Sequence, residues 1–332
     1  MTEIKAGLPK GTQAARGSIK SLVARMPAIA VSVIVMLVFL LVFYLIDHTL
    51  LVAMNIKTII YIAMSMLAVG LGQSIPVITG GIDLSVGGII SLVSVVSILF
   101  LPPLGYWAFP VTLLVAAFCG LLNGILATTC KIPSFLLTLG TGGVFTSVTY
   151  LIHAAPMTFP QKCMKYAEAF NGGIGPVKFA WIWALLAFAV FLFIQKRTYL
   201  GRTIYAVGVN ERMTWMSGIN VNRTRLLSFV LSGIGAGIAG MIISTRLYSG
   251  SAIFGNSYVL ESIACVVVGG IALTGGSGSA VNVLIGALTM GIIKNGLTII
   301  GVDVMAQQMF LGILIILAVA VTFDRTKVTI VK

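Results

Sequence analysis

Residues 84–130 read LSVGGIISLVSVVSILFLPPLGYWAFPVTLLVAAFCGLLNGILATTC, without a single charged side chain. A helix that crosses a bilayer needs about 20 apolar residues, so this stretch is long enough for two such helices. The Pro-Pro-Leu-Gly sequence at 102–105 predicts the break between them. Two adjacent spans joined by a short turn are typical of a polytopic membrane protein.

The composition of the whole chain favours the same class. Of the 332 residues, 58% are hydrophobic and 9% are charged, and the mean hydropathy is +1.09. A soluble domain carries about 25% charged residues, and it cannot hide this much apolar surface from water. The sequence therefore predicts an all-α fold, a polytopic membrane helical bundle.

Working outward from the central stretch, the runs without charges predict about ten transmembrane helices. The run at 26–46 is longer than the apolar core of a signal peptide, which has about 7–15 residues, so we expect it to be retained as a span. The predicted spans are 26–46, 58–82, two within 84–130, 132–152, 179–195, 226–245, two within 247–300 separated at 274–278, and 304–323.

The basic residues predict the orientation of these spans. An even number places both ends of the chain on one side, and most of the 21 Lys and Arg residues then fall on that side. The positive-inside rule makes it the cytoplasm. We expect a cytoplasmic tail at 1–25, a transmembrane domain at 26–323 and a cytoplasmic tail at 324–332. The net charge of +13 is therefore explained without nucleic acid, since the basic residues lie between apolar runs.

The sequence lacks the common patterns of enzymes and metal sites. It contains no GxxxxGK[ST], HExxH or GxSxG pattern and no CxxC pair, and it has only two histidines. We expect no catalytic site, no cofactor and no metal site on this chain. The few ionisable candidates at membrane depth are Asp83, Glu261, Lys294 and Asp303, and all lie near the ends of predicted spans. Their scarcity favours a transporter that draws its energy from another subunit.

Small residues recur four apart in two predicted spans. Ala116, Gly120 and Gly124 form one stripe, and Gly233 and Gly237 belong to another. Small side chains let helix backbones approach closely in lipid, so both stripes predict close packing. The tripeptide Thr-Gly-Gly occurs at 79–81 and again at 274–276, a hint of an internal repeat.

Four segments share the order and spacing of one known family. They are TGGIDLSVGG at 79–88; KIPSF at 131–135 with TLG at 138–140; TYLGR at 198–202 with IYAVG at 204–208, NE at 210–211 and SGIN at 217–220; and LESIA at 260–264 with VVGG at 267–270 and TGGSG at 274–278. Over about residues 55–323 the chain closely resembles the permeases of ribose-type ATP-binding-cassette (ABC) importers. Glu261 stands where that family usually has Asp, and Val209 replaces a usual Gly.

The resemblance implies a multi-pass permease subunit in the bacterial inner membrane. It implies that a small sugar or sugar-like solute crosses by alternating access, with pentoses, hexoses, polyols and autoinducer-type molecules all open. The implied partners are a separate ATPase subunit, a second permease that is identical or paralogous, and a periplasmic solute-binding protein. The loop at 153–178 becomes periplasmic and the loop at 196–225 becomes the cytoplasmic coupling loop. A stand-alone, ion-coupled secondary transporter is the alternative.

The coupling loop contains candidate docking residues. Asn210 is a good N-cap and Glu211 suits the first turn of a short helix. Apolar side chains would follow in a cytoplasmic loop, where they either pack on their own bundle or, as the resemblance implies, dock on the ATPase subunit. The proposed docking residues are Asn210, Glu211, Met213, Trp215, Met216 and Gly218.

Two further groups of residues complete the prediction. The residues of the family motifs are expected to fix turns and helix starts rather than to contact solute, and Asp83 to cap the helix that follows it: Gly80, Gly81, Asp83, Ser85, Gly87, Glu261, Gly269, Gly270, Gly275 and Gly276. Neutral polar and aromatic residues are candidates for the solute path, although each could equally bridge two helices: Tyr61, Gln73, Asn123, Asn282, Asn295 and Gln308.

Overall fold

The computed structural model describes residues 27–322, and the tails expected at 1–25 and 324–332 lie outside this range. The all-α prediction is confirmed. The long helices are α2 (Ala28–Ile46), α3 (Ala53–Ile78), α4 (Val86–Leu104), α5 (Ala108–Thr129), α6 (Ser134–Ile152), α8 (Phe179–Arg197), α11 (Val221–Leu247), α12 (Asn256–Val268), α13 (Ala280–Ile299) and α14 (Val304–Thr322).

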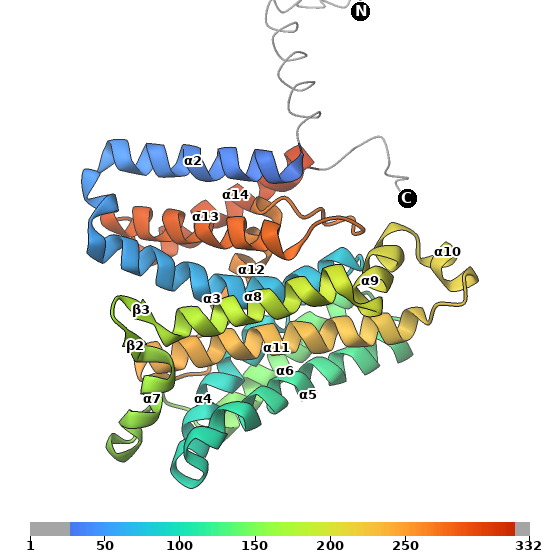
Figure 1. Cartoon of the computed structure of the whole chain (residues 1–332). Coiled ribbons are helices and arrows are strands. Elements are labelled where there is room, and N and C mark those ends of the chain that lie inside the picture. Colours follow the sequence, from blue (N-terminus) through green and yellow to red (C-terminus); the bar gives the residue numbers. More distant parts are fainter. Residues whose placement is uncertain (1–26, 323–332) are drawn as a thin grey trace, which may run out of the picture.

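Shorter elements lie at the two ends of the bundle. Helices α9 (Tyr199–Val209) and α10 (Glu211–Met216) lie at one end, and α7 (Met164–Asn171) lies at the other (Figure 1). Strand β1 (Met157–Thr158) pairs antiparallel with β4 (Ser249–Gly250), and β2 (Gly173–Ile174) pairs with β3 (Val177–Lys178). The first pairing ties the predicted periplasmic loop to the end of α11. Three 3-10 turns complete the order: η1 (His48–Leu51), η2 (Gly105–Trp107) and η3 (Gln161–Cys163).

Seven stretches of helix in the described part of the chain are long and apolar enough to cross a membrane. One of them, 86–129, contains both α4 and α5, which are joined by η2. The apolar helix α12 is shorter, as is the apolar part of α14. Helix α2 begins and α14 ends toward the end of the bundle that carries α9 and α10 (Figure 1).

Several predicted helix bounds are wrong by one or more turns. Helix α3 begins at Ala53, whereas the predicted span began at 58, after Lys57. Helix α11 begins at Val221, whereas the predicted span began at 226, after Arg223 and Arg225. A search for runs without charges stops where the terminal turns of a helix reach water. The prolines at 102 and 103 lie inside the last turn of α4, and the chain leaves the helix only after Leu104.

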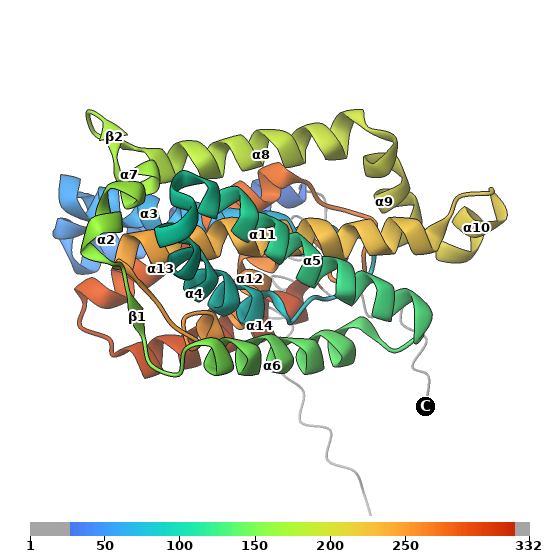
Figure 2. The same cartoon turned by 90° about the horizontal axis from the view of Figure 1, so that it is seen from below.

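Helix α11 lies at the centre of the bundle, packed against α3, α4 and α5 (Figure 2). The contacts are between backbones. A Cβ atom added at Gly120 would overlap the Phe229 carbonyl oxygen, and one added at Gly235 would lie 2.7 Å from the Ala68 carbonyl oxygen. The close packing predicted for the small-residue stripes is confirmed. By contrast, α2, α6 and α8 expose many large apolar side chains, as helices that face lipid do.

Candidate functional site

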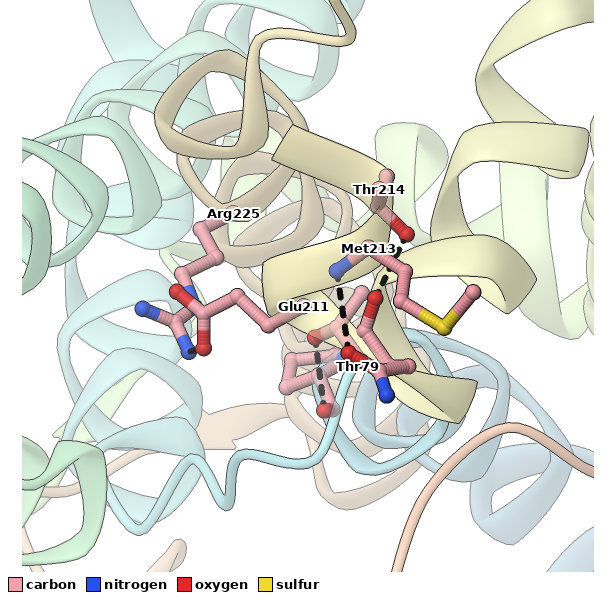
Figure 3. A network of polar contacts seen from close by, with 7 residues as sticks. Thr79, Glu211, Met213, Thr214 and Arg225 are labelled. Carbon is pink, nitrogen blue, oxygen red and sulfur yellow. Dashed lines mark hydrogen bonds and ion pairs between the residues drawn. The ribbon is translucent and has the colours of Figure 1, made fainter. Parts of the chain in front are cut away.

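Helix α10 is a short helix that projects from one end of the bundle (Figure 2). Its N-terminus is capped as predicted, since the side-chain oxygen of Asn210 accepts a hydrogen bond of 3.0 Å from the Met213 N–H. The Asn210 carbonyl oxygen accepts a second one, of 2.8 Å, from the Thr214 hydroxyl (Figure 3). Glu211 lies in the first turn, where the helix dipole favours a negative charge.

An ion pair fixes α10 to the start of α11. The Arg225 guanidinium lies 2.6 Å from the Glu211 carboxylate, and both side chains are exposed to solvent (Figure 3). The sequence did not indicate this pair, because the two residues are 14 apart and the loop offers several other cations. It holds the orientation of α10 relative to a helix that runs through the whole bundle.

The apolar side chains of α10 point away from their own bundle. Met213 is 66% exposed, Trp215 is 69% exposed and Met216 is 71% exposed. The interpretation that they pack on their own bundle is therefore wrong. Gly218, the last of the predicted docking residues, lies just after the helix, and a Cβ atom added there would meet no other atom within 4 Å. We call the exposed set of Met213, Trp215 and Met216 the α10 face.

Two hollows flank α10. One, of about 670 Å³, is lined by Glu211, Arg212, Trp215 and residues 218–222. The other, of about 580 Å³, lies toward the bundle and is lined by residues 79–82, 127, 128, 131–135, 211, 222, 225, 229 and 273. Glu211 and Asn222 contribute to both. The second hollow places the first family motif next to α10.

The first motif forms a tightly held turn between α3 and α4. The Ile82 and Leu84 N–H groups donate to the hydroxyls of Ser134 (3.0 Å) and Thr138 (2.8 Å) on α6. The buried Asp83 carboxylate accepts from the Ser85 N–H (2.9 Å) and from the Ser85 hydroxyl (2.6 Å). Helix α4 begins only at Val86, so Asp83 closes the turn before the helix and does not cap it, contrary to the prediction. Burial raises the pKa of this carboxyl.

Glycines end α3 and α12 in the same way. Gly80, with φ +84°, ends α3 through bonds from the Gly80 N–H to the Val77 oxygen and from the Gly81 N–H to the Pro76 oxygen. Gly270, with φ +86°, ends α12 through bonds of the same pattern. This is the Schellman motif, which needs a left-handed residue. The turn at 79–81 thus recurs at 269–271, whereas the second Thr-Gly-Gly, at 274–276, lies in the loop beyond the end of α12.

The other motif glycines allow backbones to approach. A Cβ atom added at Gly87 would lie 2.6 Å from the Gly255 carbonyl oxygen, and one added at Gly269 would overlap the Asn282 carbonyl oxygen. A Cβ atom added at Gly275 would lie 3.0 Å from the Gly80 nitrogen. The motif segments therefore act on packing and turns.

Glu261 is not at a helix start. It lies in the middle of α12, where its carboxylate is 2.7 Å from the Lys294 ammonium of α13, and the pair is largely buried. Lys294 also lies 5.6 Å from the centre of the Tyr258 ring. Glu261 and Lys294 therefore join α12 to α13 by a largely buried ion pair, in which each charge compensates the other in place of water.

Three of the solute-path candidates are engaged in hydrogen bonds to other segments of the chain. Asn123 donates to the Ser85 hydroxyl (2.6 Å), Asn282 donates to the Gly269 carbonyl (2.7 Å), and the Tyr61 hydroxyl donates to the Asn171 side chain (3.1 Å). Gln73 and Asn295 are buried, and Gln308 is exposed. None of the six lines either hollow beside α10. Their role in a solute path remains a prediction.

Comparison with known proteins gives a consistent set of relatives. Residues 55–319 match the family described as branched-chain amino acid transport system / permease component. The chain is 34% identical to a ribose import permease protein of Haemophilus influenzae, covering 76% of this chain and 79% of the relative. It is 35% identical to a fructose import permease protein of Rhizobium meliloti, covering 76% and 73%, and 32% identical to a D-allose transport system permease protein of Escherichia coli, covering 76% and 78%.

A solved structure is also similar at low sequence identity. It is the inward-facing conformation of a transporter assigned to the metal-chelate type of ABC transporters. The TM-score is 0.45 and the identity is 13%, over 85% of this chain and 94% of that chain.

Proposed function

The chain belongs to the family described as branched-chain amino acid transport system / permease component, and because its relatives are named as sugar permeases, we propose that it passes a small sugar or sugar-like solute through the membrane by alternating access. The resemblance to ribose-type ABC importer permeases is confirmed, since the relatives are ribose, fructose and allose permeases. The chain is thus the membrane permease component of an ABC importer. The alternative of a stand-alone, ion-coupled transporter is not favoured.

The α10 face is the observation that carries the mechanism. Three large apolar side chains lie 66–71% exposed at the end of the bundle, on a helix that is both capped and held by an ion pair. Exposed Trp and Met side chains on a fixed helix are suited to fill a pocket on a partner. The partner is the ATPase subunit, which hydrolyses ATP for a permease that needs no cofactor of its own.

The proposed topology has about ten transmembrane helices with both ends in the cytoplasm of the inner membrane. It is supported by counting α4 and α5 as separate spans and by adding the shorter helices α12 and α14 to the others. It is also supported by the start of α2 and the end of α14, which lie toward the α10 end (Figure 1). The opposite end, with α7 and the loop at 153–178, then faces the periplasm and the binding protein. A second permease subunit, identical or paralogous, completes the path.

The test is to remove the α10 face and measure both assembly and transport. The variant is Trp215→Ala with Met216→Ala, reconstituted in vesicles with the ATPase subunit and the binding protein. The matched control is Trp107→Ala with Met54→Ala, which removes the same residue types at 73% and 77% exposure at the opposite end. Loss of one anchor alone costs about 2 kcal/mol of binding, so we expect the ATPase subunit to bind at least roughly 30-fold more weakly to the α10 variant, which lacks two side chains.

The control variant should keep its full affinity for the ATPase subunit. ATP-dependent uptake by the α10 variant should fall with its affinity. Uptake by this chain alone, driven by an ion gradient, would contradict the importer. Unchanged affinity in the α10 variant would place the ATPase contact elsewhere on the cytoplasmic end.

A further inference from the structure

Three separate segments meet backbone to backbone beside α10. They are the end of α3, the loop between α12 and α13, and the end of α9. The Gly276 N–H donates a hydrogen bond of 2.8 Å to the Ile78 carbonyl oxygen, which joins the first two. Gly208, in the last turn of α9, packs on both, because a Cβ atom added there would overlap that same Ile78 oxygen. We call this contact of Gly208 with Ile78 and Gly276 the glycine junction.

The junction leaves no room for a side chain at Gly208. The atoms that a Cβ would meet there are the Ile78 oxygen and the nitrogen of Gly276, which belong to backbone rather than to flexible side chains. Backbone atoms cannot move aside without moving the segment that carries them. The α12–α13 loop is held close from the other side as well, where a Cβ atom added at Gly275 would lie 3.0 Å from the Gly80 nitrogen.

A second contact fastens α9 to the same loop. The Tyr205 hydroxyl, almost one turn before Gly208, donates a hydrogen bond of 2.7 Å to the Gly278 carbonyl oxygen. Burial of the ring raises the pKa of this hydroxyl, so it remains a donor. Helix α9 therefore grips the α12–α13 loop at two points, one steric and one by a hydrogen bond.

The connection from the junction to the α10 face is short and stiff. Only Val209 and Asn210 separate Gly208 from the first residue of α10. The Asn210 N–H still donates to the Ala206 carbonyl of α9 (3.1 Å), while the Asn210 carbonyl accepts from Thr214 of α10 (2.8 Å). A displacement of α10 thus turns α9 with it.

We propose that the glycine junction passes the movement of α10 to the end of α3 and to the α12–α13 loop, and that Gly208 and Tyr205 are positioning residues for the coupling of ATP hydrolysis to transport. This inference rests on the proposed docking of the ATPase subunit on α10. Beyond that docking, it identifies the glycine junction as the place where the force enters the membrane domain. The end of α3 and the α12–α13 loop carry parts of the first and fourth family segments. Both line the hollow of about 580 Å³, through residues 79–82 and Leu273, so a shift there opens or closes the cytoplasmic end.

The test separates coupling from assembly. The variants are Gly208→Ala and Tyr205→Phe, each studied in the full complex in vesicles with the binding protein. The matched controls are Gly143→Ala, where no atom lies within 4 Å of the added Cβ, and Tyr199→Phe, on the same helix as Tyr205 but 63% exposed. Three quantities are measured for each: affinity for the ATPase subunit, rate of ATP hydrolysis, and solute taken up per ATP hydrolysed.

We expect Gly208→Ala to keep its affinity and its hydrolysis rate within about twofold while uptake per ATP falls by about tenfold or more, since the clash acts only on the relay. Tyr205→Phe loses one hydrogen bond without a clash, so uptake per ATP should fall by about fivefold. Both controls should match the wild type.

The inference is overturned if both variants transport as much solute per ATP as the wild type. It is also overturned if uptake falls only in proportion to the amount of folded complex. Should Gly208→Ala not assemble, Tyr205→Phe decides alone, because it adds no atom to the packed junction. A wild-type complex without ATP-dependent uptake would instead contradict the proposed function. Failure of the proposed function is thereby distinguished from failure of the coupling inference.

Discussion

Removing one partner of the Glu261–Lys294 pair should destabilise the membrane domain strongly. The two charged groups are 2.7 Å apart, and their side chains are 4% and 23% exposed. Breaking a buried pair costs about 3–5 kcal/mol, because the remaining charge is left without a partner in a dry site. Lys294→Met leaves the more deeply buried carboxylate of Glu261 without a partner, so its cost should lie near the upper end of this range. Glu261→Gln leaves a partly hydrated ammonium and should lie near or below the lower end.

The double variant distinguishes a true pair from two independent residues. With both charges removed, no uncompensated charge remains, so Glu261→Gln with Lys294→Met should recover much of the lost stability. We expect a coupling free energy of about 2 kcal/mol or more, at the upper part of the usual range for residues in contact. The free energy of unfolding is measured by titrating the reconstituted protein with a denaturing detergent. Additivity of the two single variants within about 0.5 kcal/mol would refute the reasoning.

The chain supplies a control pair for this experiment. Arg225 and Glu211 are separated by a similar distance, 2.6 Å, but their side chains are 37% and 50% exposed. Exposed pairs contribute less than about 1 kcal/mol, since water solvates each charge when the other is removed. Glu211→Gln should therefore change the free energy of unfolding by under about 1 kcal/mol. Burial is the main difference between the two pairs, so the contrast measures its effect.

Three other substitutions test the turn, the packing and the cap. Asp83→Asn should leave stability nearly unchanged, whereas Asp83→Ala should cost about 1–3 kcal/mol by leaving the Ser85 N–H unpaired. Because burial raises the pKa of Asp83, the free energy of unfolding of the wild type should rise as the pH falls through that pKa, and Asp83→Asn should abolish this dependence. Gly120→Ala should lower the thermal midpoint sharply because its Cβ overlaps a backbone oxygen of α11, whereas Gly143→Ala, with open space around it, should not. Asn210→Ala should remove about 1 kcal/mol of helix stability from α10 and weaken ATPase binding up to about fivefold, and Asn210→Asp should restore it; equal affinities of the three proteins would contradict the cap's role.

The interior of each span could be predicted from the sequence, and the ends could not. An apolar run of bilayer length has a single good environment, so its existence is a local property. The ends depend on where water and headgroups begin. Lys57, Arg223 and Arg225 lie within helices although they interrupt the apolar runs. Helix α12 was expected as an ordinary span but has only 13 residues, because it begins only at Asn256, after β4, and Gly270 stops it before the predicted break at 274.

The candidate site divides in the same way between local and distant interactions. The cap at Asn210 and the first-turn position of Glu211 follow from neighbours in sequence, and both were predicted. Glu261 and Lys294 are 33 residues apart, and Asn123 and Ser85 are 38 apart. Such pairs exist only once the helices have packed, and a single sequence offers many equally suitable partners. The exposure of the α10 face is likewise set by what the rest of the bundle leaves uncovered.

The packing of α11 explains why movement should concentrate at the loops. Gly72 and Gly235 bring α3 and α11 into backbone contact, and Gly120 and Gly233 do the same for α5 and α11. Backbones in contact cannot slide without lifting over one another, so these three helices move as one body. A force applied at α10 therefore cannot be absorbed by shifts between them. It must reach the end of α3 and the α12–α13 loop, which α9 contacts through Gly208.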